Sequence, residues 1–398
     1  MESPYVGILV NDKLHSRLPS GNTQYEAVDF YVEAAGEYGL TPCFFRIQDV
    51  KRDTFRVNAY VKENGRFVQK HIPLPAVIHN RAIYNGSAEY NELSSWVAGG
   101  TRLFNQWNRY GKLRVHELLM QNPDLRPHLP GTSAANTTNI GIMMKLYDKI
   151  IIKPDRSSIG RGVMLLQKIA SGWKLTYPVS LSVRNKKKRH LRFRGPRLPA
   201  LLVRRLKKMP YIVQQCLALA TYRGRPFDLR VSVQRDGSGL WQVTGLVAKV
   251  APKGSFLTNV AQGGTVHRLE DILAEEYPLL DGQLVYAQLC DFSLRVCRYL
   301  GEQLPHLADL GLDVGMTKDG YPLFVECNGK DQRYSLREAG LLDEWKASFF
   351  NPIAYSKYLL DSCVKEQIPQ KPSMPPTRHH RQWKWGTKSN FQGSDVML

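Results

Sequence analysis

The chain has 398 residues, 43% of them hydrophobic and 23% charged, and its formal net charge is +20. This composition excludes a disordered chain, and the length allows two or three domains. No apolar stretch reaches the roughly 18 residues of a membrane-spanning helix, and the cysteines form no CxxC pair, so neither a transmembrane segment, a zinc site nor a disulfide framework is indicated. The sequence therefore predicts a soluble protein of a reducing cytoplasm.

Residues 1–110 are predicted to form an N-terminal α/β domain. Residues 5–10, 43–47 and 76–79 are apolar runs typical of strands. The tetrapeptide Thr23-Gln24-Tyr25-Glu26 fits a capping box that would open a helix through Gly39. Strand, helix and strand in this order predict a parallel sheet.

Residues 111–365 are predicted to form a second, strand-rich region with one clear helix. Residues 115–120 favour a short helix near its start. The clear helix carries apolar side chains at the spacing i, i+4, i+7, i+11, which is the pattern of a core stripe: Val285, Leu289, Phe292, Val296 and Leu300. Residues 366–398 contain Pro, Ser, His and Lys with few aliphatics, and we expect a flexible tail there.

More than half of the excess positive charge lies in residues 184–208, RNKKKRHLRFRGPRLPALLVRRLKK, which hold twelve Lys or Arg and no acid. A run of this kind predicts a solvated insertion. No helix-turn-helix, zinc-finger or RNP-like pattern accompanies it, which argues against specific nucleic-acid binding. Attraction of an anionic substrate or surface stays open.

Residues 151–163, IIKPDRSSIGRGV, have the outline of a phosphate-covering hairpin. Lys153 supplies a positive charge from a strand end, and Ser157 and Ser158 add hydrogen-bond donors. Gly160 and Gly162 let backbone N–H groups approach an anion. Neither a GxxxxGK[ST] loop nor a GxGxxG fingerprint occurs, so an ordinary Gly-rich hairpin remains the alternative.

Further polar residues follow at strand ends. A buried strand at 211–213 precedes Gln214 and Gln215, a plausible reader of a purine edge. Asp228 and Arg230 share one face of a later strand, where a local salt bridge is the alternative. The next such positions along the chain are Lys249, Asn259, Gly263 and Gly264.

Two carboxylates interrupt runs that otherwise predict buried strands in residues 311–330, GLDVGMTKDGYPLFVECNGK. A two-residue Asp319-Gly320 turn would place Asp313 opposite Glu326, with Asn328 on the same face. Opposed like charges are destabilising, and a divalent cation such as Mg²⁺ would reverse that effect. The alternative is a wider turn that shifts the register and leaves Glu326 solvated.

The order of these motifs resembles the ATP-grasp superfamily and, more narrowly, the YheC/YheD family of endospore coat-associated proteins. The resemblance covers residues 5–365, and the blocks at 228–230, 259–264 and 313–328 carry it. It implies an ATP-grasp fold, two α+β subdomains that clasp ATP, behind the N-terminal α/β domain.

The resemblance also implies cofactors and residue roles. The cofactors are ATP and Mg²⁺, with Mn²⁺ as an alternative. The implied ATP-binding residues are Lys153, Ser157, Ser158, Gly160, Gly162, Gln214, Gln215, Cys216 and, near the ribose, Asp228. The implied catalytic residues are Lys249, Asn259 and Arg230, and the implied metal ligands are Asp313, Glu326 and Asn328. Lys112 is a looser match to an ATP-contacting lysine, and Arg81 marks the substrate side.

The activity implied is that of a carboxylate–amine (or thiol) ligase that works through an acyl phosphate on a small acidic or peptide substrate. The alternative is a non-catalytic structural or assembly protein of the spore coat that retains the nucleotide-binding fold. Both place the protein in the mother-cell cytoplasm or the spore coat, with spore-coat proteins as partners. His79, His116 and His267 are expected to be structural.

Overall fold

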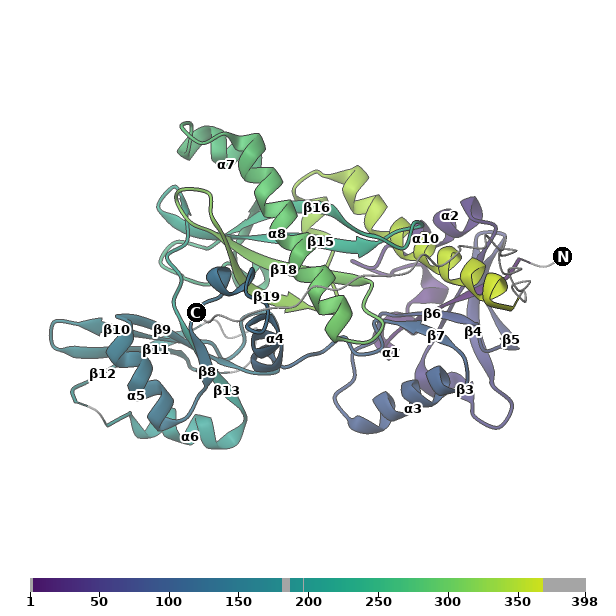
Figure 1. The fold of residues 1–398 in the computed structure, drawn as a ribbon. Coiled ribbons are helices and arrows are strands. Elements are labelled where there is room, and N and C mark those ends of the chain that lie inside the picture. Colours follow the sequence, from purple (N-terminus) through teal and green to yellow (C-terminus); the bar gives the residue numbers. More distant parts are fainter. Residues whose placement is uncertain (1–2, 181–186, 196, 368–398) are drawn as a thin grey trace, which may run out of the picture.

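The computed structural model describes residues 3–180, 187–195 and 197–367. They form three sheets arranged in an elongated molecule, with the first sheet at one end, the second at the other, and the third between them (Figure 1). Among these residues no helix is both long and apolar enough to cross a bilayer.

The N-terminal sheet is mixed. Strand β1 lies between β2 and β6 and runs parallel to both, and β7 runs parallel to β6. The predicted parallel arrangement of the strands at 5–10, 43–47 and 76–79 is confirmed, and β4, which the sequence analysis did not predict, pairs antiparallel with β2, β3 and β5. The strands are β1 (Tyr5–Leu9), β2 (Thr41–Phe45), β3 (Val50–Lys51), β4 (Arg56–Glu63), β5 (Arg66–Pro73), β6 (Val77–Asn80) and β7 (Arg102–Phe104). The helices are α1 (Asp12–His15), α2 (Val28–Glu37) and α3 (Ser87–Ala98).

The predicted capping box at residues 23–26 does not form. Helix α2 begins at Val28, and its N-cap residue makes no side-chain hydrogen bond. Glu26 instead accepts two hydrogen bonds from Arg81, at 2.8 and 3.0 Å, and one from the Tyr31 hydroxyl. A bidentate hydrogen-bonded pair with arginine is stronger than a helix-capping hydrogen bond. Glu26 therefore pairs with Arg81, 55 residues away in sequence, and does not cap the helix.

The second sheet has the order β12-β11-β10-β9-β13-β8. Its strands are β8 (Thr132–Ala134), β9 (Lys149–Pro154), β10 (Met164–Ile169), β11 (Gly172–Pro178), β12 (Lys188–Phe193) and β13 (Tyr211–Gln215), and its helices are α5 (Thr137–Leu146) and α6 (Ala200–Lys208). The basic run is part of this unit rather than a loop attached to it, because β12 pairs with β11 and Leu202 of α6 is fully buried. Its residues 184–186 and 196 lie outside the described residues.

The third sheet has the order β17-β16-β15-β18-β19, with β14 paired to β15. Its strands are β14 (Thr221–Tyr222), β15 (Arg225–Arg235), β16 (Trp241–Val250), β17 (Thr265–His267), β18 (Asp309–Met316) and β19 (Pro322–Asn328). Helices α4 (Lys112–Leu119), α7 (Leu269–Glu276), α8 (Gly282–Gln303) and α9 (Tyr334–Glu338) accompany it. The predicted stripe of α8 is confirmed, since all five of its residues are buried in the core on this sheet.

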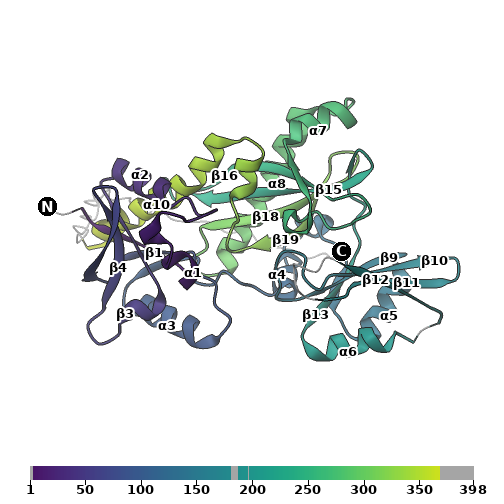
Figure 2. The ribbon, with the colours of Figure 1, turned by 180° about the vertical axis from the view of Figure 1, so that it is seen from behind.

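Helix α10 (Leu342–Gln367) connects the third sheet to the N-terminal unit. It packs against β15 and β16 and also against α2 and β6 (Figure 2). Phe349 and Ile353 are buried in the same core as Val6 and Ile8 of β1. The predicted tail, 366–398, lies outside the described residues except for 366 and 367, which end this helix.

Candidate functional site

Asp313 on β18 lies opposite Glu326 on β19, as the sequence predicts, but the turn that joins these strands differs. Thr317 N–H bonds to Tyr321 O, so the loop spans three residues, 318–320, rather than two. A bulge after Asp313 shifts the register back by one residue. The two departures cancel, and the carboxylates face each other across the ladder.

Two cations already compensate the Asp313 carboxylate. Lys249 Nζ lies 2.7 Å from Asp313 and 3.0 Å from Asp228. Arg230 Nε lies 2.9 Å from Asp313, and its Nη1 lies 3.1 Å from Asp331. Every one of these side chains is buried or nearly so, with Asp313 5% exposed and Lys249 4% exposed. Contrary to the sequence argument, this charge arrangement does not by itself require a metal ion.

The pKa directions follow from this sharing of cations. Burial opposes ionisation of Asp313, but Arg230 and Lys249 outweigh it and hold the pKa of Asp313 below its usual range. Burial dominates at Asp228, which shares Lys249 with Asp313, and raises its pKa. The pKa of Lys249 is raised, because the two carboxylates overcome the effect of burial. Lys249 is therefore a stable cation.

Glu326 and Asn328 complete the polar wall that β19 presents. Lys112 Nζ lies 3.3 Å from Glu326 and donates to Ser157 O at 2.6 Å, so it connects β19 to the Gly-rich turn. The Asn328 Nδ2 atom is buried and has no hydrogen-bond partner in the part of the chain that the structure describes. Among the described residues no group of three or more His, Cys, Asp or Glu is placed to hold a metal. The predicted ligand set, two carboxylates and one amide, is not a group of that kind.

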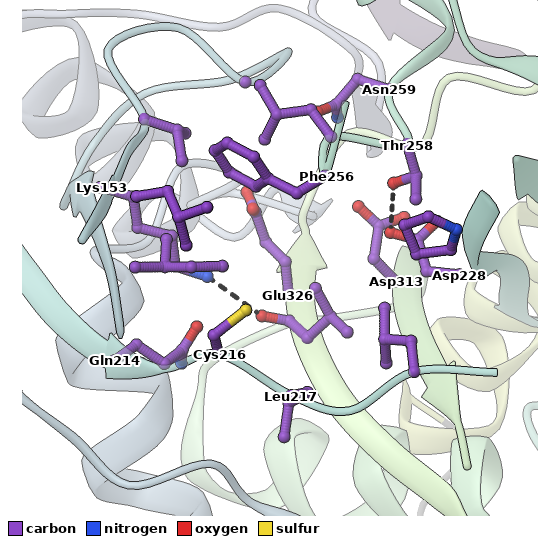
Figure 3. Close-up of a pocket in the computed structure, with 18 of the residues that line it drawn as sticks. Lys153, Gln214, Cys216, Leu217, Asp228, Phe256, Thr258, Asn259, Asp313 and Glu326 are labelled. Atoms are coloured by element: carbon purple, nitrogen blue, oxygen red, sulfur yellow. Dashed lines mark hydrogen bonds between the residues drawn. The ribbon is translucent and has the colours of Figure 1, made fainter. Parts of the chain in front are cut away.

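A cavity of about 420 Å³ lies between the second and third sheets. Figure 3 shows Lys153 and Gln214 on one wall, Asp228 and Asp313 on the other, and Phe256 across its top. Its apolar lining is Ile151, Val163, Leu165, Leu217, Leu219, Phe256, Leu257 and Val325. Lys153 is buried here, its one hydrogen-bond partner among the described residues is the Val325 carbonyl at 3.4 Å, and burial lowers its pKa to about 8.

The Gly-rich turn between β9 and β10 contacts the loop that follows β16. Gln262 donates to the Ile159 carbonyl at 3.0 Å. Gly160 has φ +69°, and a Cβ at this position would lie 2.7 Å from Asn259 Oδ1. Lys188 on β12 donates to Ser255 Oγ at 3.2 Å and lies 4.9 Å from the Phe256 ring centre. These contacts cover the first cavity.

A second cavity, of about 310 Å³, lies beside the first and reaches toward the N-terminal unit. Arg109, Arg230, Lys249, Asn328 and Lys330 line it together with residues of the Gly-rich turn. The residues that line both cavities, and so mark their junction, are Lys112, Ser157, Arg161, Asn259, Asp313 and Glu326.

Most residues that the sequence marked lie on these two cavities. The first is lined by Lys153, Ser157, Gly160, Gln214, Gln215, Cys216, Asp228 and Asn259, and the second adds Ser158, Arg230, Lys249 and Asn328. Gly162 shares the turn but does not line either cavity. The three histidines at 79, 116 and 267 line neither.

Sequence reasoning missed Asp331 and Lys330. Asp331 is fully buried, bonds to Arg230 and accepts from Ser232 Oγ. Lys330 lines the second cavity. The same parity that paired Asn328 with Glu326 extends to position 330, so a signal for Lys330 was present in the sequence.

Two subdomains with antiparallel sheets and a cavity between them are typical of an ATP-grasp protein. The chain belongs to the YheC/D-like ATP-grasp family, whose model matches residues 100–359. This confirms the resemblance and the predicted fold class.

The relatives found by sequence come from Bacillus subtilis (strain 168). Endospore coat-associated protein YheD is 23% identical over 324 residues, covering 76% of this chain and 67% of the relative. Endospore coat-associated protein YheC is 24% identical over 329 residues, covering 79% and 87%. Among solved structures, the ATP-grasp ligase PsnB with its minimal precursor has a TM-score of 0.48 at 16% identity, covering 87% of this chain and 100% of that one. D-cycloserine synthetase DcsG has a TM-score of 0.48 at 12% identity, covering 87% and 99%.

Proposed function

We propose that the protein is an ATP- and Mg²⁺-dependent ligase that joins a carboxylate to an amine or thiol through an acyl phosphate. One observation carries this proposal. Two cavities, one partly apolar and one polar, meet at Asn259, Asp313 and Glu326. Such a pair accommodates a nucleotide and an acyl substrate whose reacting groups meet at the junction.

ATP would occupy the first cavity. The apolar residues from both sheets suit a flat purine, and the backbone at residues 214–216 borders it. Lys153 is a buried amine without a carboxylate at hydrogen-bond distance among the described residues. A phosphate would supply its missing partner. Ser157, Gly160 and the rest of the turn would cover the phosphates.

Magnesium would be held by Asp313, Glu326 and Asn328. Two carboxylates and one amide form an oxygen donor set of the kind that Mg²⁺ and Mn²⁺ accept. The side-chain oxygen of Asn328 would be the ligand, and its buried Nδ2, which has no acceptor among the described residues, would donate to a phosphate oxygen. When bound, the ion would neutralise charge on the phosphates.

The chain's own cations would act on the transferring phosphoryl group. A carboxylate oxygen of the substrate attacks the γ-phosphorus while the bond to the ADP oxygen breaks, which yields an acyl phosphate and ADP. The amine or thiol then attacks the carbonyl carbon, loses its proton, and phosphate leaves with the bonding electron pair. Lys249 and Arg230 lie on the wall of the second cavity and stabilise the charge that develops. No protein nucleophile is required.

Trapping the acyl phosphate tests this proposal. The protein is incubated with ATP, Mg²⁺, hydroxylamine and a panel of small acids and acidic peptides. We expect ADP and the hydroxamate of at least one acid in equal amounts, and loss of both in Lys249→Met. Lys168→Met removes a surface lysine that pairs with Asp148, and it should behave as the wild type. The absence of ADP with every acid would count against a ligase.

A second function, coat assembly without turnover, is favoured by a different observation. Arg230 and Lys249 compensate Asp313 within the chain, so this site is stable without ATP or metal. The relatives are named as endospore coat-associated proteins, and this supports a location in the mother-cell cytoplasm or at the spore coat, with coat proteins as partners. Nucleotide binding without ADP release in the trapping experiment would support this function.

A further inference from the structure

Lys330 lies at the end of the second cavity that faces the N-terminal unit. It follows β19 directly and lines the second cavity but not the first. Its side chain is half-buried, and it has no hydrogen-bond acceptor and no ion-pair partner among the described residues. Its ammonium group therefore has no counter-ion of its own.

The charged groups around Lys330 are already paired with one another. Arg81 lies 2.8 Å from Glu26 and 3.3 Å from Asp309, and Arg333 lies 2.5 Å from Asp309. Two guanidinium groups thus meet two carboxylates, and all four act electrostatically on Lys330. The charge of Lys330 is the surplus in this cluster. A surplus charge in a half-buried site is costly unless a ligand supplies the opposite sign.

The carboxylates around the junction of the two cavities are also paired with cations of the chain. Asp313, Asp228, Asp331 and Glu326 each have a cation of the chain within 3.3 Å, in Arg230, Lys249 or Lys112. Of the lysines that line the two cavities and are not exposed, Lys153 and Lys330 are the two without a carboxylate at ion-pair distance among the described residues, one in each cavity. The phosphates of ATP would pair with Lys153.

The anionic group that would pair with Lys330 differs from the carboxylate that attacks the γ-phosphate. A carboxylate that attacks the γ-phosphate must lie at the junction of the cavities, beside Asp313 and Glu326. Lys330 lies beyond that junction, on the side of the N-terminal unit. Arg109 lines the same cavity, and within the described part of the chain its guanidinium bonds to neutral acceptors, Asn85 Oδ1 and the Arg156 carbonyl.

We propose, resting on the proposed function, that Lys330 binds a second anionic group of the acyl substrate, a carboxylate or phosphate apart from the carboxylate that reacts. The substrate is accordingly an acid with at least two negative groups, such as a small di-acid or a peptide with an acidic side chain.

Chemical protection of the Lys330 amine locates the binding. The wild type is acetylated briefly with acetic anhydride, with succinate, inorganic phosphate or chloride present at equal ionic strength, and each lysine is quantified by mass spectrometry. A probe at nine times its Kd should slow labelling of Lys330 about tenfold, with Lys168 unchanged. The more protective probe identifies a carboxylate or a phosphate. Equal labelling of Lys330 with all three anions would overturn the proposal.

Variants separate this site from the nucleotide site. Succinate should raise the unfolding midpoint of the wild type and of Lys330→Arg, and that rise should be absent in Lys330→Met, an uncharged side chain of similar length. Lys330→Met should keep the stabilisation by ATP and Mg²⁺, which also shows that it is folded. A Lys330→Met protein that responds fully to succinate contradicts the proposal. A succinate response without any ATP response would instead contradict the proposed nucleotide function and leave the anion site standing.

Discussion

Lys249 on β16 lies 2.7 Å from Asp313 on β18, although strand β15 separates these two strands in the sheet. The side chains meet over β15, which contributes Asp228 and Arg230 to the same cluster. Alternating cations and carboxylates across three strands thus produce a buried network in which each charge has an opposite neighbour.

Asp313→Asn should destabilise the protein by about 3 kcal/mol, because it leaves Lys249 and Arg230 with one carboxylate fewer in a buried site. Urea denaturation at neutral pH measures this. Asp319→Asn, in the exposed turn of the same hairpin, serves as the control and should change the free energy of unfolding by less than about 0.5 kcal/mol. Equal stability of the two variants would show that the network contributes nothing.

The Glu26–Arg81 pair predicts a pH dependence of stability. Burial alone would raise the pKa of Glu26, but Arg81 and its neighbours lower it to about 2, from an ordinary value of 4.5. The unfolded chain therefore binds the proton more readily between these values, so the contribution of Glu26 is complete above about pH 4.5 and is lost as the pH falls toward 2.

Glu26→Gln should accordingly lower stability at pH 7 and make its decline between pH 4.5 and 2 shallower. Denaturation midpoints across this range measure both effects. Glu33→Gln removes an exposed carboxylate that pairs with Lys346, and it should change stability by at most about 1 kcal/mol. An unchanged slope in Glu26→Gln would contradict the assigned role of the Arg81 pair.

Lys153 predicts proton uptake when ATP binds. With its pKa lowered to about 8 by burial, roughly half of the Lys153 side chains are neutral at pH 8 in the free protein. A bound phosphate favours the charged form, so binding should take up about half a proton at this pH and weaken as the pH rises further. Titration calorimetry in two buffers of different ionisation enthalpy measures the uptake. Lys153→Arg should bind without it, and wild-type binding without uptake would refute this assignment.

Gly160→Ala should weaken ATP binding. Its backbone lies in the left-handed region, and the added methyl group would collide with Asn259 at the contact that closes the Gly-rich turn over the cavity. Gly254 has φ +75° with no atom near the position of a Cβ, so Gly254→Ala carries the same backbone strain, about 1–2 kcal/mol, without the collision. Similar loss of affinity in both variants would assign the effect to backbone strain alone.

Local patterns predicted several parts of this structure correctly. The α8 stripe follows from helical periodicity, and the opposition of Asp313 and Glu326 follows from strand parity. The predicted two-residue turn between them is nevertheless wrong. The predicted pairing of Asp313 with Glu326 holds because a bulge offsets the longer loop. Bulges depend on packing across the whole sheet, which no local pattern records.

Pairings between distant residues account for most of what the sequence did not predict. The sequence predicted Glu26 as a residue of a capping box, and the fold shows that it instead accepts hydrogen bonds from Arg81. The compensation of Asp313 by Lys249 depends on the order of strands in the third sheet. The opposed carboxylates therefore suggested a metal ion, since the cations that balance them lie 64 and 83 residues away in sequence.

Thermal unfolding with ATP and Mg²⁺, singly and together, tests the central claim most directly. A ligand at about 100 times its Kd should stabilise the wild type by about 2.7 kcal/mol, and we expect the full rise in midpoint only when both are present. Glu326→Gln should retain the response to ATP and lose the part that Mg²⁺ adds. If the wild type shows no rise with ATP and Mg²⁺ together, the cavity between the second and third sheets is not a nucleotide site.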